Sequence, residues 1–401
     1  MKTVIDQKRI DELFARGTVT DIFPSKELLV KKLLAGEKIR IYYGLDPTHT
    51  AIHLGHAKNL IFLEELRQLG NEVIVLFGDF TAQIGDPTDK SATRKSLTVD
   101  DIAKNMSDWL RQISPIIDFK DKTNPAQIRH NSEWLGKLSF ADILSLASNF
   151  TVQQLIERDM FQKRLKEGAP IHLHEFMYPL VQGYDSAAMD VDAELCGTDQ
   201  IFNALAGRTL MKKLKDKEKF VIALNLVANP VTGQLMSKSN GTGVFIDQSA
   251  NDLFGSLMAL PDPMLDPLFV NCTRIPMTEK DSVMSQGPRL AKALIAKDIV
   301  KRFHGEDAAV SAEQAFEATF AKGGVPDDVL EISLADGKVT GASLAEALIR
   351  AGIVPSKTEW RRLVTDGAVR TEKDEKITDP AFVPASGTVL KIGKRRFVKI
   401  V

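Results

Sequence analysis

The sequence predicts an α/β protein that begins with a parallel sheet covered by helices on both faces, continues with an α-helical domain and ends in a small α+β domain. Three observations predict this architecture. Short β-rich runs alternate with longer helical patterns from residue 39 to about residue 224. Strand signals are absent between residues 251 and 320, where apolar residues recur at helical spacing. The last 60 residues combine two amphipathic helical patterns with alternating β-type runs.

The first two strands and the helix between them form the clearest unit. Strand patterns at Ile39–Tyr43 and Val73–Phe77 flank a helical pattern at His56–Leu69, which is the order of a βαβ unit. A later helix, Asp199–Lys212, precedes another strand, Phe220–Leu224. Ligands of such sheets bind at the carboxyl ends of the strands, so the residues directly after the first two strands are the first candidates for a site.

The rest of the chain divides at changes of pattern. A glycine- and proline-containing break at Gly323–Asp328 ends the helical region. Two helices, beginning near Leu344 and at Ser356, then precede strand patterns at Val389–Ile392 and Arg396–Ile400. The predicted domains are residues 1–240, 241–325 and 341–401, with a linker at 326–340.

Composition and charge exclude several classes of protein. With 401 residues, 52 basic and 53 acidic side chains and 44% hydrophobic residues, the chain has the composition of a folded protein with two or three domains. Apolar runs such as Val73–Phe77 are far shorter than the ~18 residues of a membrane span. The Met1–Arg16 segment carries Asp6, Asp11 and Glu12 and has no apolar core. We therefore expect a cytoplasmic protein without a membrane partner. Cys196 and Cys272 alone cannot form a disulfide framework or a thiolate zinc site.

The charge is unevenly distributed. From Ala335 to the end the chain has 13 basic and 8 acidic residues, a net charge of +5, whereas the preceding part has a net charge of −6. A basic module at one end favours a polyanionic partner, although a solvated surface explains a modest excess equally well.

Three histidines follow the first strand within eight residues: His49, His53 and His56. A metal site is one interpretation, but a third ligand and an acidic partner are missing nearby, and the spacing is not that of H-E-x-x-H. A phosphate site is the better interpretation, because a helix amino terminus and imidazole N–H groups favour anions and Gly55 lets a ligand approach the backbone. The chain has no G-x-x-x-x-G-K-[ST] loop, so we expect an ATP site of another type.

A second polar run, Gln234–Gly241, contains Ser237, Lys238 and Ser239. Alone, this run is typical of a solvated loop. Together with His53-Leu54-Gly55-His56, it resembles the two signatures of the class I aminoacyl-tRNA synthetases, His-Ile-Gly-His and Lys-Met-Ser-Lys-Ser. The resemblance implies a Rossmann-type catalytic domain.

Further stretches narrow the resemblance to the tyrosyl-tRNA synthetases. They are Tyr42–Thr48, Tyr178–Asp185 and Gly197–Gln200, and in order they cover nearly the whole first domain. The last domain is similar to the S4 RNA-binding domain at Glu359–Val364 and Gly393–Phe397. The resemblance implies activation of L-tyrosine by ATP and its transfer to tRNA(Tyr), with Mg²⁺ on the ATP phosphates, no dedicated metal site and a homodimeric assembly.

The resemblance also implies roles for individual residues. Tyrosine binding falls to Tyr42, Asp86, Tyr178, Gln182, Asp185 and Gln200. ATP binding falls to Gly44, Asp46, Gly55, His56, Gly197, Asp199, Met236, Ser237, Lys238 and Ser239. Catalysis falls to Thr48, His53, His56, Lys90, Arg94 and Lys238. RNA binding falls to Arg361, Arg362, Lys394, Arg395 and Arg396.

Simpler interpretations compete for some of these residues. Tyr178 also suits helix packing, Asp199 a helix cap, and Lys90 and Arg94 solvated cations. From chemistry alone, Tyr42 and Asp185 are suited to pair with the hydroxyl that distinguishes tyrosine from phenylalanine.

The sequence departs from the family pattern in the second signature, where Leu235 replaces the first lysine. This leaves Lys238 as the cation expected to act on the phosphates. It also keeps open a non-catalytic RNA-binding protein on the same scaffold. Tryptophan is the alternative substrate, disfavoured by Tyr42, Asp185 and the S4-like tail. Cys196 stands where many relatives have glycine and is expected to be a packing residue.

Overall fold

The computed structural model describes residues 3–86, 98–237, 241–318, 329–332, 341–372, 375–393 and 396–401. The chain divides into two compact units, residues 1–309 and 310–401, which are described separately. The first unit contains the predicted sheet and most of the predicted helical domain. None of the described helices is both long and apolar enough to cross a membrane.

The first unit is built on a six-stranded sheet of order β1-β6-β5-β2-β3-β4. All neighbouring strands are parallel except β1, which runs antiparallel to β6 at one edge. The strands are β1 (Val19–Phe23), β2 (Arg40–Leu45), β3 (Glu72–Phe77), β4 (Gln127–His130), β5 (Ala193–Gly197) and β6 (Phe220–Leu224).

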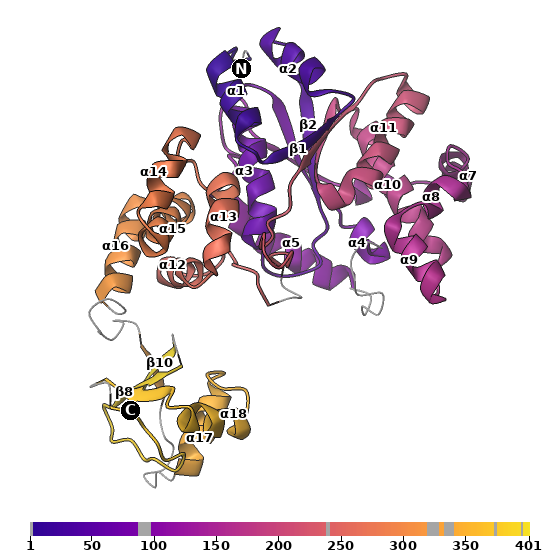
Figure 1. Cartoon of the computed structure of the whole chain (residues 1–401). Coiled ribbons are helices and arrows are strands. Elements are labelled where there is room, and N and C mark those ends of the chain that lie inside the picture. The colour runs from indigo at the N-terminus through magenta and orange to yellow at the C-terminus, as the bar shows by residue number, and fades with distance from the viewer. Residues whose placement is uncertain are drawn as a thin grey trace. The chain divides into compact units, whose positions relative to one another are not determined.

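Helices cover both faces of this sheet, with α1 and α3 on one side and α10 and α11 on the other (Figure 1). The predicted fold class is therefore confirmed. The helices before β6 are α1 (Gln7–Ala15), α2 (Lys26–Leu34), α3 (Leu54–Gln68), α4 (Thr81–Ile84), α5 (Val99–Ile113), α6 (Ser132–Leu135), α7 (Phe140–Ala147), α8 (Val152–Ile156), α9 (Asp159–Glu167), α10 (Leu173–Met189), the 3₁₀ turn η1 (Thr198–Gln200) and α11 (Ile201–Lys215).

The region after residue 250 is helical, as its periodicity predicts. Buried apolar side chains on α12 and α15 recur at helical spacing, which packs these helices together. The elements are α12 (Ala250–Met258), η2 (Asp262–Met264), α13 (Leu265–Cys272), η3 (Met277–Glu279), α14 (Lys280–Ser285), α15 (Pro288–His304) and α16 (Glu306–Phe316).

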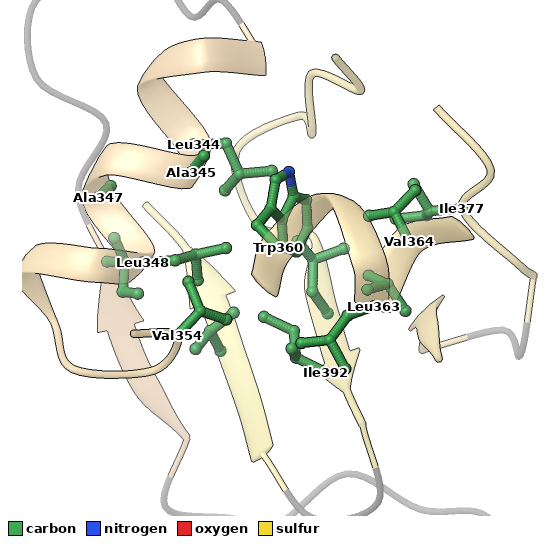
Figure 2. Close-up of a cluster of buried hydrophobic side chains, with 14 of the residues drawn as sticks. Leu344, Ala345, Ala347, Leu348, Val354, Trp360, Leu363, Val364, Ile377 and Ile392 are labelled. Carbon is green, nitrogen blue, oxygen red and sulfur yellow. The ribbon is translucent and has the colours of Figure 1, made fainter. Parts of the chain in front are cut away.

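The second unit packs two helices against a four-stranded sheet of order β7-β10-β9-β8. Its core surrounds the fully buried Trp360, whose Nε1 donates to the carbonyl oxygen of Pro380 at 3.1 Å (Figure 2). Strand β7 lies inside the predicted linker and pairs in parallel with β10, the last strand of the chain. The elements are β7 (Leu330–Ile332), α17 (Gly341–Arg350), α18 (Lys357–Thr365), β8 (Val369–Thr371), β9 (Val389–Ile392) and β10 (Arg396–Ile400).

Candidate active site

The candidate site lies where the strand order changes direction. From β2, the chain continues to β3 on one side and returns much later as β5 on the other. Open α/β sheets bind ligands in the crevice at the carboxyl ends of two such strands. The end of β2 carries Tyr42, Gly44 and Asp46, and the end of β5 carries Gly197 and Asp199. Predicted site residues from two distant stretches of sequence therefore meet at one edge of the sheet.

The amino terminus of α3 presents two imidazoles to this edge. His53 is the N-cap of the helix, and its Nδ1 accepts a hydrogen bond from the Gly55 N–H at 3.1 Å. Burial, with a smaller effect of His49, lowers the pKa of His53 to about 4, so the ring is neutral at pH 7. Because Nδ1 is the acceptor, the single proton of the neutral ring is on Nε2, which can donate to an anion.

His56 stacks on His53 with 4.1 Å between ring centroids. Burial, followed by the neighbouring histidines, lowers the pKa of His56 well below its usual value. Its Nδ1 is buried and has no hydrogen-bond partner among the described residues. Both histidines therefore act as neutral polar groups at a helix amino terminus, which suits an anionic ligand.

The two signature motifs contact each other. Backbone hydrogen bonds of 2.9 and 3.0 Å join residues 52–54 to residues 244–246, just after the second motif. A β-carbon placed on Gly55 would lie 3.6 Å from the carbonyl oxygen of Met236. Although about 180 residues separate them in sequence, the motifs therefore form one wall of the site.

Thr242 closes the second motif into a loop. Its Oγ1 donates to the Leu235 carbonyl oxygen at 2.7 Å and accepts from the Ser237 N–H at 3.1 Å. Lys238 and Ser239 lie outside the described residues, so the structure leaves their predicted contacts open. Sequence reasoning missed Thr242, which carries no motif signal of its own.

Helix α5 holds the loop between β2 and α3. The side chain of Asn105 donates to the Pro47 carbonyl oxygen at 2.8 Å. Gln112 donates to the Thr50 carbonyl oxygen and accepts from the Ile52 N–H, both at 2.8 Å. Sequence reasoning missed these two amides, although amide side chains on the buried face of an amphipathic helix are a usable signal.

Asp46 is held by two hydroxyl groups. Thr81 Oγ1 donates to Asp46 Oδ1 at 2.7 Å, and the Tyr178 hydroxyl donates to Oδ2 at 2.8 Å. Burial raises the pKa of Asp46 to about 7 despite these hydrogen bonds. A β-carbon on Gly78 would come within 1.9 Å of Asp46 Oδ1, so only glycine fits there. Thr48 follows directly, with its N–H donating to the Asp46 carbonyl oxygen at 2.7 Å.

The predicted phenol-binding pair lies deeper in the sheet. Asp185 is 2% exposed and accepts from Trp134 Nε1 at 2.7 Å and from Asn131 Nδ2 at 3.3 Å. The Tyr42 hydroxyl is 3.1 Å from the Ser186 Oγ, and Tyr42 is also almost fully buried. Burial raises the pKa of both Tyr42 and Asp185. Asp185 is therefore the neighbour in α10 of Ser186, the residue whose hydroxyl contacts Tyr42.

Other predicted tyrosine ligands are hydrogen-bonded to amides and carboxylates of the protein. Gln200 Nε2 donates to Asp86 Oδ2 at 2.6 Å and Gln200 Oε1 accepts from Asn203 at 2.7 Å. Gln182 Nε2 donates to Glu194 Oε1 at 3.1 Å. Lys90 and Arg94, the predicted pyrophosphate ligands, lie outside the described residues.

The predicted ATP glycines differ in their surroundings. At Gly197 a β-carbon would come within 2.5 Å of Asp199 Oδ1, so the missing side chain lets that carboxylate fold back. Gly44 is exposed at the end of β2. Cys196, expected to be a packing residue, is buried in an apolar cluster with Ala204.

Some of the predicted RNA-binding cations of the second unit are already engaged in ion pairs or hydrogen bonds within that unit. Arg361 and Arg362 lie on the exposed side of α18, and Arg362 is paired with Glu359 at 2.7 Å. The Arg396 guanidinium donates to the carbonyl oxygen of Ile353 within the unit. Lys394 and Arg395 lie outside the described residues.

Among the described residues, no group of three histidine, cysteine or acidic side chains is arranged to hold a metal ion. The histidine cluster of α3 lies beside a tryptophan, Trp109, whose ring is 6.1 Å from that of His56. What the site offers is therefore a set of neutral donors for an anion and buried carboxylates for a polar, positively charged ligand.

A doubly wound sheet with these two adjoining motifs defines a nucleotide-dependent synthetase. Residues 34–321 match the family model of "tRNA synthetases class I (W and Y)". The chain belongs to this family of class I tRNA synthetases.

Relatives that match over nearly the whole chain include tyrosine–tRNA ligases. The chain is 41% identical to the tyrosine–tRNA ligase of Carboxydothermus hydrogenoformans over 99% of each chain. It is 40% identical to the tyrosine–tRNA ligase of Francisella tularensis, covering 97% of this chain and 98% of the relative. A truncated mitochondrial tyrosyl-tRNA synthetase of Aspergillus nidulans shares the fold with a TM-score of 0.65, at 21% identity, over 79% of this chain and 95% of that chain.

The buried His53 predicts a pH dependence of stability. Its pKa is ~6.5 in an unfolded chain and about 4 in the fold. Between these values the unfolded chain binds a proton that the folded chain does not, so stability falls as the pH drops from about 6.5 to about 4. His53→Asn keeps an acceptor for the Gly55 N–H. We expect it to reduce the loss of unfolding free energy between pH 7 and pH 4.5 by about 2 kcal/mol, measured by urea unfolding.

His174→Asn is the matched control, because His174 is exposed on α10. This variant should show the same pH dependence as the parent chain. Identical pH profiles for the His53 and His174 variants would contradict the assignment of a buried neutral imidazole to His53.

Proposed function

We propose that the chain is a tyrosine–tRNA ligase, which activates L-tyrosine with ATP and transfers it to the 3′-terminal ribose of tRNA(Tyr). The observation that carries the proposal is the contact of the two signature motifs at the switch point of the sheet, next to the pair formed by Tyr42 and the Asp185-bearing helix. The proposed site thus has an anion-binding end at the histidines and a polar end at Tyr42 and Asp185. We place the activity in the cytoplasm.

In the first step, a carboxylate oxygen of tyrosine attacks the α-phosphorus of ATP. The new carboxyl–phosphorus bond replaces the bond to pyrophosphate, which leaves with the electron pair. In the second step, a ribose hydroxyl of the tRNA attacks the carbonyl carbon and AMP leaves. No protein nucleophile is required, so catalysis consists of positioning and of stabilising charge on the phosphates.

The anion-binding end supplies the donors for this chemistry. His53 Nε2–H and His56 are both neutral at pH 7, so they face the phosphates as uncharged hydrogen-bonding groups and add no positive charge. Thr48 acts from the loop before α3, and Lys238 with the Ser237 and Ser239 hydroxyls from the second motif. Lys90 and Arg94 act on the pyrophosphate. Gly44, Gly55 and Met236 provide backbone surface for the nucleotide, and Gly197 and Asp199 bind its ribose.

Mg²⁺ enters this scheme on the ATP phosphates. We propose that the ion would be bound mainly by substrate oxygens and water, as Mg²⁺ commonly is at nucleotide sites. When bound, the ion neutralises charge on the phosphates.

The polar end distinguishes tyrosine from phenylalanine. Tyr42 and Asp185 are buried, so a substrate without the phenolic hydroxyl would leave part of their hydrogen-bonding capacity unused, beyond the bonds they already make within the protein. This is the mechanism for which tyrosine-specific synthetases are the standard example. Asp86, Tyr178 and Gln182 bind the substrate ammonium group, and Gln200 lies near its carboxylate.

Amino-acid-dependent ATP–pyrophosphate exchange without tRNA tests the activity. We expect exchange with tyrosine and none with phenylalanine or tryptophan. Because Leu235 removes one cation from the second motif, Lys238 should supply most of its charge. Lys238→Ala should lower the exchange rate by about 10²–10³, the usual effect of removing one preorganised charge-stabilising group.

Lys213→Ala, on the exposed side of α11, should exchange at the parental rate. Exchange with another amino acid would overturn the assigned pocket, and a near-parental rate for Lys238→Ala would overturn the role of that lysine. Folded protein that exchanges with no amino acid but binds RNA would favour the non-catalytic alternative.

The second unit is proposed to bind the tRNA backbone through Arg361, Arg362, Lys394, Arg395 and Arg396, as an S4-type domain. Its net positive charge and the exposed face of α18 support this role. Phosphate contacts give affinity without reading sequence and weaken with salt.

Removing residues 329–401 tests this role without splitting the sheet that contains β7. The shortened chain should retain pyrophosphate exchange and lose most aminoacylation at physiological salt, measured with the same preparation. An equal loss of both activities would point to a damaged catalytic unit instead.

A homodimer is proposed from exposed apolar side chains on helices α7 to α10. Phe140 is 77% exposed, Leu144 55%, Val152 66% and Leu173 76%. Such side chains are costly to leave in water and are typical of protein–protein contacts.

The double variant Phe140→Asp with Leu144→Asp should therefore sediment as a monomer, whereas the parent chain sediments as a dimer. The control is Leu214→Asp, since Leu214 is 43% exposed on the distant end of α11. A dimer that survives the double variant would place the interface elsewhere.

A further inference from the structure

A buried ion pair lies beneath the tyrosine pocket. Lys219 is fully buried, Glu194 is 2% exposed, and the Lys219 ammonium is paired with Glu194 Oε2. The ammonium also donates to Ser186 Oγ at 2.7 Å and to the Ala204 carbonyl oxygen at 3.2 Å. All three ammonium protons therefore have partners, which compensates for much of the cost of burying a charge.

The fold creates the space for this pair. Glu194 on β5 is the register partner of Val221 on β6, and Lys219 precedes Val221 by two residues, so both side chains project from the same face. A β-carbon on Gly207 of α11 would come within 2.5 Å of the Lys219 ammonium. The missing side chain at Gly207 is what admits the ammonium between α10 and α11.

The second oxygen of Glu194 determines the orientation of Gln182. An ionised carboxylate only accepts hydrogen bonds, so Gln182 must turn its NH₂ group towards Glu194 Oε1. Its Oε1 then points the other way. This oxygen is buried and has no hydrogen-bond partner among the described residues.

We propose that Lys219 and Glu194 are positioning residues that hold the Gln182 carbonyl oxygen ready to accept a hydrogen bond from the ammonium group of bound tyrosine. The inference rests on the proposed role of Gln182 as an ammonium ligand. An ammonium group only donates, so it requires the oxygen and is repelled by the NH₂ end of the amide.

Each member of the pair has a distinct part. Glu194 selects the orientation of the amide through the oxygen that it offers to Gln182. Lys219 binds the other oxygen, Oε2, and so fixes the carboxyl group; without Lys219 the amide is no longer held in one orientation. The amide can then turn over and present its NH₂ group to the substrate.

The test uses two tyrosine analogues in the full chain. L-Tyrosinol keeps the ammonium group and lacks the carboxylate, whereas 3-(4-hydroxyphenyl)propanoate keeps the carboxylate and lacks the ammonium group. Binding of each is measured by titration calorimetry for the parent chain, Lys219→Met, Glu194→Gln and the double variant. Since both probes carry the phenol, disturbance transmitted through Ser186 to Tyr42 affects them equally.

We expect each variant to lose about tenfold or more in affinity for tyrosinol, after correction for any change in its affinity for the propanoate. This is the usual effect of losing a hydrogen bond to a charged group. Each single variant leaves an unpaired buried charge and should have a lower thermal midpoint. The double variant removes both charges and should recover much of that midpoint while its tyrosinol binding stays weak. A purely structural pair would instead regain stability and binding together.

Lys217→Met is the matched control, because Lys217 lies two residues away and pairs with Asp192 at 2.9 Å outside the pocket. It should bind both probes as the parent chain does. Equal loss of both probes, or full tyrosinol binding in the double variant, would overturn the inference. Parent protein that fails to exchange pyrophosphate with tyrosine would instead overturn the proposed function.

Discussion

The parallel pairing of β2 with β5 is the contact on which the site depends. It joins Tyr42 to Glu194 in register, although these residues belong to distant parts of the chain. Because β3 lies on the other side of β2, the helices that follow β2 and β5 pack on opposite faces and leave the crevice between them. This pairing places the histidine motif after β2 next to the Gly197 turn after β5, and the second signature loop follows β6, which pairs with β5 in turn.

The site also requires many polar groups in a dry interior. Asp46, Asp185, Glu194 and Lys219 are each surrounded by hydrogen-bond partners supplied by neighbouring elements. Replacing such groups by apolar side chains of similar volume is often neutral or stabilising in proteins. Their presence here is explained by recognition of a polar substrate more readily than by stability.

The fold was predictable where the signal is local. Helices α3 and α18 and strands β3, β6, β9 and β10 follow from periodicity within short windows. Strands β1, β4, β5, β7 and β8 were not predicted, because they are short and their pairing depends on partners elsewhere in the sequence. The antiparallel direction of β1 has the same explanation.

The predictable part of the site consists of residues inside recognisable motifs. The structure places His53, Gly55 and Met236 near one another, and the roles assigned to them stay predictions. It does not describe Lys90, Arg94, Lys238, Ser239, Lys394 or Arg395, so these remain predictions. Supporting residues such as Asn105, Gln112 and Lys219 were not predicted. Their role is defined by the backbone or carboxylate group that they contact and not by a sequence pattern around them.

Strand β7 sets the amino-terminal boundary of the second unit. It covers one side of β10, whose other side is paired with β9. A fragment that begins at residue 341 would lack β7 and expose the edge of β10 that β7 covers at Val398–Ile400. Unpaired edges of this kind recruit strands from other molecules and promote aggregation. The short β7 therefore protects the unit from self-association, and the functional boundary of the unit lies before Leu330.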